Sequence, residues 1–203
     1  MSRQLLPTDG GSLPRYSYMC SLATDAKAND HRRTPFTAND WGVVTVYISE
    51  RLKKLLEDSG TDYQVIEHDL AFTALEEAAA THVPGRNWAK TVVVLVAGRP
   101  ALATLPATRR VDADKLRRVT GSDEVELATE DEFQTLFPDC ELGAMPPFGN
   151  LYGQDTFVDD SLQEDEFIAF HAGDHRTAVE ISYDAYIALV APIAGDFSEP
   201  VCT

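Results

Sequence analysis

The stretch that most constrains the fold of this chain is an apolar run preceded by a lysine. Residues 91–97 are almost continuously apolar and rich in β-branched side chains, which predicts a strand buried on both faces. Lys90 stands at the head of this strand. A lysine in such a position either extends its ammonium group back to water or supplies a positive charge to a site, and the strand alone does not distinguish the two.

The composition permits one full-sized hydrophobic core and excludes several classes of protein. The chain has 203 residues, of which 44% are hydrophobic. No apolar run approaches the roughly 20 residues of a membrane span, and the N-terminus lacks the apolar core of a signal peptide. The three scattered cysteines have no metal-binding spacing and favour a reducing compartment. We therefore expect a cytoplasmic protein without a membrane segment or a disulfide framework.

Caps, turns and alternating segments predict the remaining elements. Residues 1–42 lack periodicity and are expected to form a poorly ordered arm, whereas residues 43–203 form the folded domain. Helices are expected to begin after five N-cap residues, which are Ser49, Thr73, Asp112, Thr129 and Ser182. The helix that begins after Thr129 is expected to extend to Phe137. Strands are expected at 63–68, 91–97, 101–105, 124–128, 156–158, 166–171 and 176–181. Many short strands among helices predict an α+β domain with a curved mixed sheet.

One basic window stands out in an acidic chain. The formal net charge of −16 argues against a nucleic-acid partner, but residues 86–118 carry eight basic side chains against two acidic ones. A local basic surface is enough to contact a phosphate backbone. The candidate phosphate contacts are Arg86, Arg109, Arg110, Arg117 and Arg118. The alternative is a solvated face balanced by acidic neighbours, and the sequence leaves both open.

A glycine- and proline-rich segment, residues 143–149, is the second unusual stretch. It predicts either a ligand-binding loop or a structural turn. His171, beside a turn expected at Gly173, is a candidate pocket residue. His171 and His175 are expected to flank that turn rather than share a helical face, so zinc ligation is not predicted. Cys140 is expected to be a buried small residue and not a nucleophile.

Taken in order, these motifs resemble the YbaK and prolyl-tRNA synthetase-associated editing domain family. The resemblance covers residues 43–193 and rests on His68-Asp69 ahead of a capped helix, Lys90 before its strand, Gly143-x-x-x-Pro147, and Ala172-Gly173 before a strand and helix. It implies a single α+β domain with a mixed, mostly antiparallel, barrel-like β-sheet flanked by helices. It also implies a trans-acting aminoacyl-tRNA deacylase, which cleaves the ester of a mischarged tRNA.

The resemblance further implies roles for individual residues. Lys90 matches the essential lysine of the family, Gly143 and Pro147 the loop beside the scissile ester, and Gly173 the last active-site turn. Ala178 stands where some bacterial members have an acidic residue, which leaves the amino acid and the substrate mechanism open. No cofactor and no metal are implied. The implied partners are the acceptor end of an aminoacyl-tRNA and an aminoacyl-tRNA synthetase, and the oligomeric state is not indicated.

Ester hydrolysis fits these residue types. A lysine ammonium can steady a phosphate or a developing negative charge, and backbone groups of a glycine loop can position the attacking group. The hydroxyl of the terminal adenosine, next to the ester, can supply part of the acid–base work. The expected pocket wall prefers a small aminoacyl group such as alanine, serine or cysteine; its residues are Ala144, Met145, Pro146, Pro147 and Phe148. Two alternatives remain: a catalytically silent tRNA- or synthetase-binding module, and a small-molecule ester hydrolase on the same scaffold.

Overall fold

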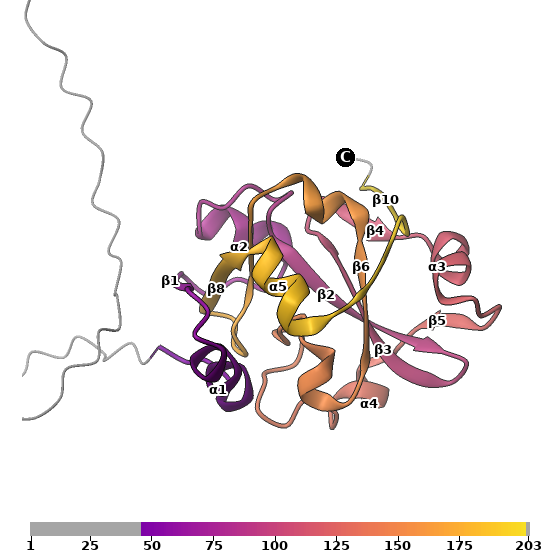
Figure 1. Ribbon diagram of the computed structural model, residues 1–203, viewed down its shortest axis with the longest axis horizontal. Helices are drawn as coiled ribbons and strands as arrows, with labels where there is room; N and C mark the ends of the chain where they lie inside the picture. Colours follow the sequence, from indigo (N-terminus) through magenta and orange to yellow (C-terminus); the bar gives the residue numbers. More distant parts are fainter. Residues whose placement is uncertain (1–45, 202–203) are drawn as a thin grey trace, which may run out of the picture. The chain divides into compact units, whose positions relative to one another are not determined.

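The computed structural model describes residues 46–201 (Figure 1), so the expected arm of residues 1–42 lies outside the described part of the chain. The helices are α1 (Glu50–Ser59), α2 (Ala74–Ala80), α3 (Ala113–Thr120), α4 (Glu130–Phe133) and α5 (Tyr183–Val190), with 3₁₀ helices η1 (Gly149–Tyr152) and η2 (Asp160–Glu164). The strands are β1 (Gln64–Glu67), β2 (Ala89–Val96), β3 (Arg99–Pro106), β4 (Arg109–Val111), β5 (Val125–Leu127), β6 (Asp155–Asp159), β7 (Phe167–His171), β8 (Thr177–Ser182), β9 (Ile193–Gly195) and β10 (Ser198–Pro200). In this part of the chain no helix combines the length and the hydrophobicity that a membrane crossing requires.

The strands are arranged in three sheets. One sheet has the order β1-β8-β7 and is antiparallel throughout, and a second has the order β5-β2-β3-β6-β9. In the second sheet β3–β6 and β6–β9 are parallel pairs, whereas the other pairs are antiparallel. A third, two-stranded sheet pairs β10 with β4. The expected α+β class and mixed, mostly antiparallel pairing are confirmed, but these strands do not close into a barrel.

The helices begin where the caps predict. Ser49, Asp112 and Ser182 each accept a hydrogen bond from a backbone N–H in the first turn of α1, α3 and α5. Thr73 and Glu76 form a complete capping box at the start of α2. These bonds satisfy N–H groups that a helix cannot satisfy internally, which is why short local patterns locate helix starts well.

The helix expected after Thr129 is shorter than its pattern suggested. It ends at Phe133, and Phe137 lies beyond it in irregular backbone, where it belongs to a buried cluster with Leu102 and Met145. Tertiary packing therefore buries Phe137 outside any helix, and Leu136 is partly buried beside it. The strands β4, β9 and β10 were not expected, since each has only three residues and no alternating pattern.

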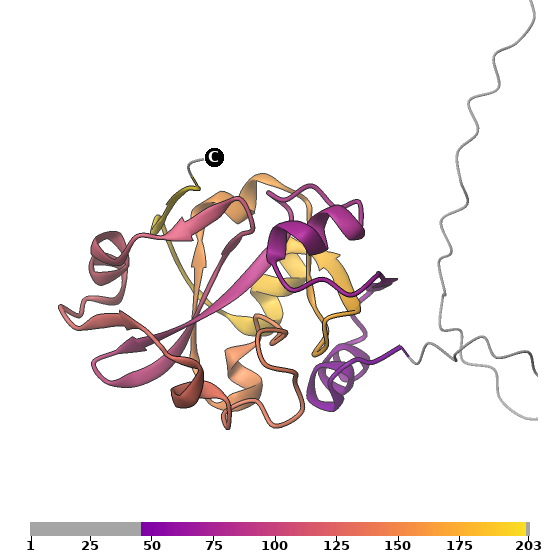
Figure 2. The same cartoon turned by 180° about the vertical axis from the view of Figure 1, so that it is seen from behind.

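β2 is the strand that connects the two larger sheets. One of its edges pairs with β3 from Ala89 to Val96. The other edge pairs with β5 only from Val94 onward, and the residue preceding the strand, Trp88, bridges Ala169 of β7. Residues 90–92 therefore have no strand on this second edge, between the bridge to β7 and the pairing with β5, where the two sheets diverge. Figure 2 shows β2 as the long magenta strand that crosses the domain.

Candidate active site

Lys90 occupies the second position of β2, on this half-paired part of the strand. Its register partner on β3 is the buried Leu105, and Val92 projects from the same face two residues later. The ammonium group is half-buried, and loss of hydration lowers its pKa from the ordinary value of 10.5. No carboxylate within residues 46–201 forms an ion pair with it. A partly desolvated cation of this kind is suited to hold an anionic group of a substrate.

The loop that carries Gly143 is tied to the turn at Gly173. The backbone N–H of Glu141 donates to the carbonyl of Gly173 at 2.8 Å. Both glycines have φ values in the left-handed region, 89° and 127°. At Gly173 a Cβ would also lie 3.1 Å from side-chain atoms of Ser49 and Tyr47, so a side chain there would have to displace these neighbours as well as adopt a strained φ. The structure thus brings together two segments that the sequence analysis assigned to one site.

A buried cluster of one carboxylate and two imidazoles adjoins this loop. Glu77 of α2 has no exposed side-chain surface, and its Oε2 lies 2.6 Å from Nε2 of His171 while its Oε1 lies 3.4 Å from Nδ1 of His175. The indole of Trp88 packs edge-on against His171, with ring centroids 5.5 Å apart. A Cβ at Gly143 would lie 3.5 Å from Cε1 of His175. The cluster therefore connects α2, the β7–β8 turn, the start of β2 and the glycine loop.

The residues expected to form the aminoacyl pocket wall, 144–148, are buried, and within 143–149 only Gly143 is exposed. Met145 packs against Val93 and Leu102, which project from the face of the sheet opposite Lys90. The ring of Phe148 packs against Phe170 and Tyr186, and the Tyr186 hydroxyl donates to the carbonyl of Pro147 at 3.2 Å. These contacts anchor the loop to the hydrophobic core. Direct contact of these side chains with an aminoacyl group stays a prediction.

Most charges of the basic window are balanced by carboxylates. The pairs are Arg86–Asp165, Arg109–Asp159, Arg110–Glu199, Lys115–Asp196 and Arg117–Asp114. Four of the five acidic partners come from residues 159–199, far from the window in sequence. Arg118 is exposed and makes no ion pair within the described residues. This arrangement favours the solvated, acid-balanced face over a phosphate patch, and contacts between these arginines and RNA stay a prediction.

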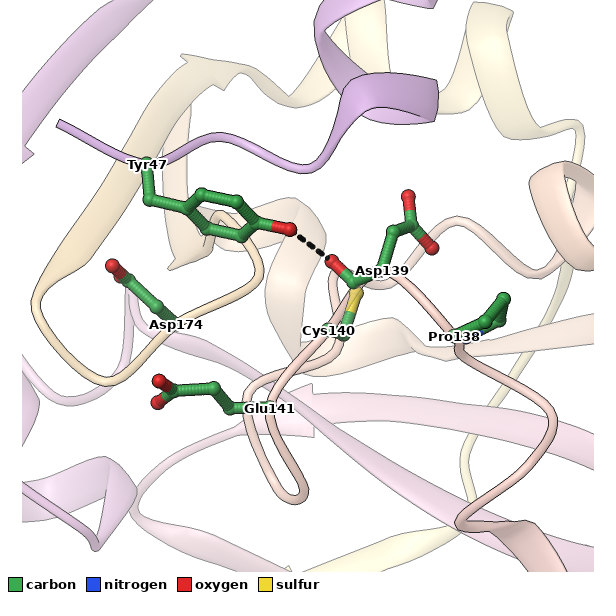
Figure 3. Close-up of a pocket in the computed structure, with 6 residues that line it drawn as sticks. All are labelled: Tyr47, Pro138, Asp139, Cys140, Glu141 and Asp174. Carbon is green, nitrogen blue, oxygen red and sulfur yellow. Dashed lines mark hydrogen bonds between the residues drawn. The ribbon is translucent and has the colours of Figure 1, made fainter.

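A separate pocket of about 400 Å³ lies beside the Gly173 turn (Figure 3). It is lined by Tyr47, Pro138, Asp139, Cys140, Glu141 and Asp174. Burial raises the pKa of the Cys140 thiol to about 11, so the group stays protonated at neutral pH and is a poor nucleophile, as expected. The residue is half-buried, however, and not fully buried as its type suggested. Because three carboxylates line the pocket, it disfavours the phosphate of an RNA end.

Glu77 and His175 are the cluster residues that sequence reasoning missed. Glu77 follows the capping Glu76 in an alanine-rich helix, where a second glutamate reads as an ordinary solvent-facing residue. His171 and His175 flank the turn, as expected, but both rings nevertheless face Glu77. Ala178 is buried directly opposite His171 in the β7–β8 register, so no acidic side chain occupies that position beside the cluster.

Comparisons with known proteins show a family and, separately, a shared fold. The family model described as "Aminoacyl-tRNA editing domain" matches residues 68–189. The solved structure of a "putative trans-editing enzyme for prolyl tRNA synthetase" is 23% identical with a TM-score of 0.66, covering 74% of this chain and 96% of that chain. The structure of hypothetical protein APE2540 is 21% identical with a TM-score of 0.67, covering 74% of this chain and 100% of that chain. At these identities the two structures establish the shared fold. No curated protein matches the chain.

Proposed function

Because the chain belongs to the aminoacyl-tRNA editing domain family, we propose that it is a trans-acting aminoacyl-tRNA deacylase. In this proposal it hydrolyses the ester between a small amino acid and a mischarged tRNA in the cytoplasm. The observation that carries the proposal from the family to this chain is Lys90, a half-buried cation without a carboxylate partner in residues 46–201. Its position between diverging sheets gives an anionic substrate group a cation to contact.

The proposed chemistry divides the work between protein and substrate. The Lys90 ammonium holds a phosphate of the acceptor end or the negative charge that develops on the ester carbonyl. Gly143, exposed and without a side chain, lets the ester approach the loop backbone, which positions the attacking water. The hydroxyl of the terminal adenosine next to the ester supplies part of the proton transfer. Hydrolysis then returns the free amino acid and the uncharged tRNA.

The preference for a small aminoacyl group follows from the stiffness of the loop. Pro146 and Pro147 fix φ at two successive positions. The buried Tyr186, whose ring packs against Phe148, donates from its hydroxyl to the carbonyl of Pro147. A loop held in this way adapts poorly to a large side chain. An editing enzyme needs such exclusion because one methylene changes binding by only about 1–3 kcal/mol. Alanyl, seryl and cysteinyl esters are therefore the proposed substrates.

The test is a screen of the purified full-length protein against a panel of mischarged tRNAs. Loss of the labelled aminoacyl ester is measured at neutral pH and corrected for spontaneous hydrolysis, with alanyl, seryl, cysteinyl, phenylalanyl and tryptophanyl esters on the same tRNA bodies. We expect the small esters to be cleaved and the large ones to survive. Rates equal to the spontaneous rate for every ester would reject the deacylase proposal and leave the silent binding module.

A small-molecule ester hydrolase is the second candidate, and one observation favours it. Most of the basic window is paired with carboxylates, so little free positive charge remains there for a tRNA body. The two candidates differ in how they treat the tRNA beyond its last nucleotide. Equal kcat/KM for alanyl-tRNA and for 2′(3′)-O-alanyladenosine would favour the small-ester enzyme, and a large excess for alanyl-tRNA would favour the deacylase.

A further inference from the structure

The side chains at the centre of the buried cluster direct their ligand atoms toward one another. One carboxylate oxygen of Glu77 and one ring nitrogen each of His171 and His175 all lie within 4.8 Å of one another. The Glu77 side chain is completely buried, and the two histidine side chains are 7% and 10% exposed. Water therefore contributes little to solvating a charge at this point, and the cluster must balance its charge internally.

The second ring nitrogen of each histidine is already occupied by a backbone carbonyl. Nε2 of His175 lies 2.9 Å from the carbonyl oxygen of Leu142, and Nδ1 of His171 lies 3.3 Å from that of Asp174. A carbonyl oxygen only accepts hydrogen bonds, so these nitrogens carry the hydrogens. In neutral imidazoles the remaining nitrogens then present lone pairs to Glu77. Two lone pairs facing a buried carboxylate are unfavourable unless a positive charge lies among them.

The contact between Glu77 and His171 also indicates that the cluster requires a positive charge. Their Oε2 and Nε2 atoms are 2.6 Å apart, yet they are not aligned as donor and acceptor. The buried Oε2 has no hydrogen-bond partner among the described residues. An unpaired buried carboxylate oxygen costs stability, and one surrounded by two imidazole nitrogens is a set of atoms that transition metals bind well.

We propose that Glu77, His171 and His175 form a binding site for a divalent transition-metal ion of the zinc type. Two histidines and one glutamate are a donor set that zinc uses with its fourth position free for water or substrate. Tetrahedral bonds of about 2.0–2.1 Å put ligand atoms roughly 3.3 Å apart. The three ligand atoms already lie within 4.8 Å of one another, so side-chain rotations that bring them together by up to about 1.5 Å complete the site. The carbonyls of Leu142 and Asp174 supply the second hydrogen bond that orients a metal-bound histidine.

The competing explanation is a cluster held together by protons alone, with one or both imidazoles charged beside Glu77. The two explanations differ in what the folded protein binds. Metal binding is measured without tRNA, so its outcome is independent of the deacylase proposal. Glu76 supplies a matched control, because it is the neighbouring glutamate on the same helix, and because glutamine is accepted at its capping-box position.

The experiment uses the full-length protein, stripped with a chelator and dialysed, at neutral pH. Zinc is titrated against the protein in competition with a chromophoric chelator, and Co²⁺ is added to a second sample to record its visible absorption. Both measurements are repeated for Glu77→Gln, His175→Asn and Glu76→Gln, with circular dichroism on each variant. Thermal unfolding of the wild type is followed with and without zinc.

We expect one zinc per wild-type chain, the intense visible bands of four-coordinate Co²⁺, and a zinc-dependent rise in Tm of about 5–10 °C at 100-fold excess over Kd. Glu77→Gln and His175→Asn should each weaken binding by more than the 10–100-fold effect of losing an outer-shell partner, whereas Glu76→Gln should bind as the wild type does. If the folded wild type takes up no zinc, or if both ligand variants bind it as tightly as the wild type, the metal site is wrong. In the first case the protonated cluster is the correct description.

Discussion

Replacing Lys90 by methionine separates the charge of the side chain from its volume. At an effective dielectric constant of about 20, two unit charges 4 Å apart interact by about 4 kcal/mol. Because about 1.4 kcal/mol corresponds to a factor of ten in rate, and because comparable donors to a developing oxyanion contribute about 2.7–4 kcal/mol, Lys90→Met should lower kcat/KM by about 10²–10³-fold.

The same substitution should leave the fold intact. The half-buried ammonium loses hydration and has no carboxylate partner in residues 46–201, so its removal should leave Tm unchanged or raise it. The sign of the pH dependence follows from the lowered pKa. Between the folded-state pKa and 10.5 the unfolded chain binds more protons than the folded one, so the wild type gains stability as the pH rises through this interval, and Lys90→Met lacks that gain.

The assay is single-turnover deacylation of the best mischarged tRNA at neutral pH, with thermal unfolding on the same preparations. Lys53→Met is the matched control, since it removes an exposed lysine of α1 remote in sequence from the site. A wild-type rate for Lys90→Met would refute the catalytic role of the charge. Loss of activity together with a large fall in Tm would refute the claim that the charge acts on the substrate rather than on the fold.

Three further predictions address RNA binding, the loop and its anchoring. Under the deacylase proposal, neutralising four arginines should reduce the log–log salt slope of tRNA binding by about 0.7–0.9 per lost phosphate contact; the four are Arg109, Arg110, Arg117 and Arg118. An unchanged slope would assign them to the acid-balanced face that their ion pairs favour. Gly143→Val should abolish deacylation while tRNA binding persists in a filter assay, because φ is 89° and the added carbons approach His175; normal turnover would contradict this. Gly149→Ala should destabilise the protein by about 1–3 kcal/mol in urea unfolding, because its Cβ would lie 2.5 Å from Oγ1 of Thr156, and an unchanged midpoint would show that the loop relaxes.

Local signals predicted most of the fold. Ser49, Thr73 and Ser182 were identified as caps because a cap is a bond between residues three apart, which the sequence displays directly. The three-residue strands β9 and β10 were not predictable in this way. Each exists because β6 or β4 lies beside it, and that proximity is a property of the folded chain.

The residues of the candidate site also divide into those that local sequence signals identify and those that only the folded structure identifies. Lys90, Gly143 and Gly173 were identified through motif order, and the structure brings the two glycines into one loop-and-turn unit. The role of Glu77 could not be predicted from the sequence, because nothing local distinguishes its carboxylate from that of Glu76 on the same helix. Only the packing of α2 against the β7–β8 turn decides which glutamate is buried.

The pairing of β1 with β8 has a consequence for the chain as it leaves the ribosome. Gln64 pairs with Glu180, roughly 115 residues later, and among residues 46–201 β8 is the only strand beside β1 in its sheet. At about 5–20 residues per second, synthesis of the intervening segment takes roughly 6–23 s. Throughout that time β1 is a nascent strand without its partner, and its unpaired edge can bind chaperones or other nascent chains. Slowing elongation between these two strands should therefore lower the yield of native protein more than slowing it after Ser182.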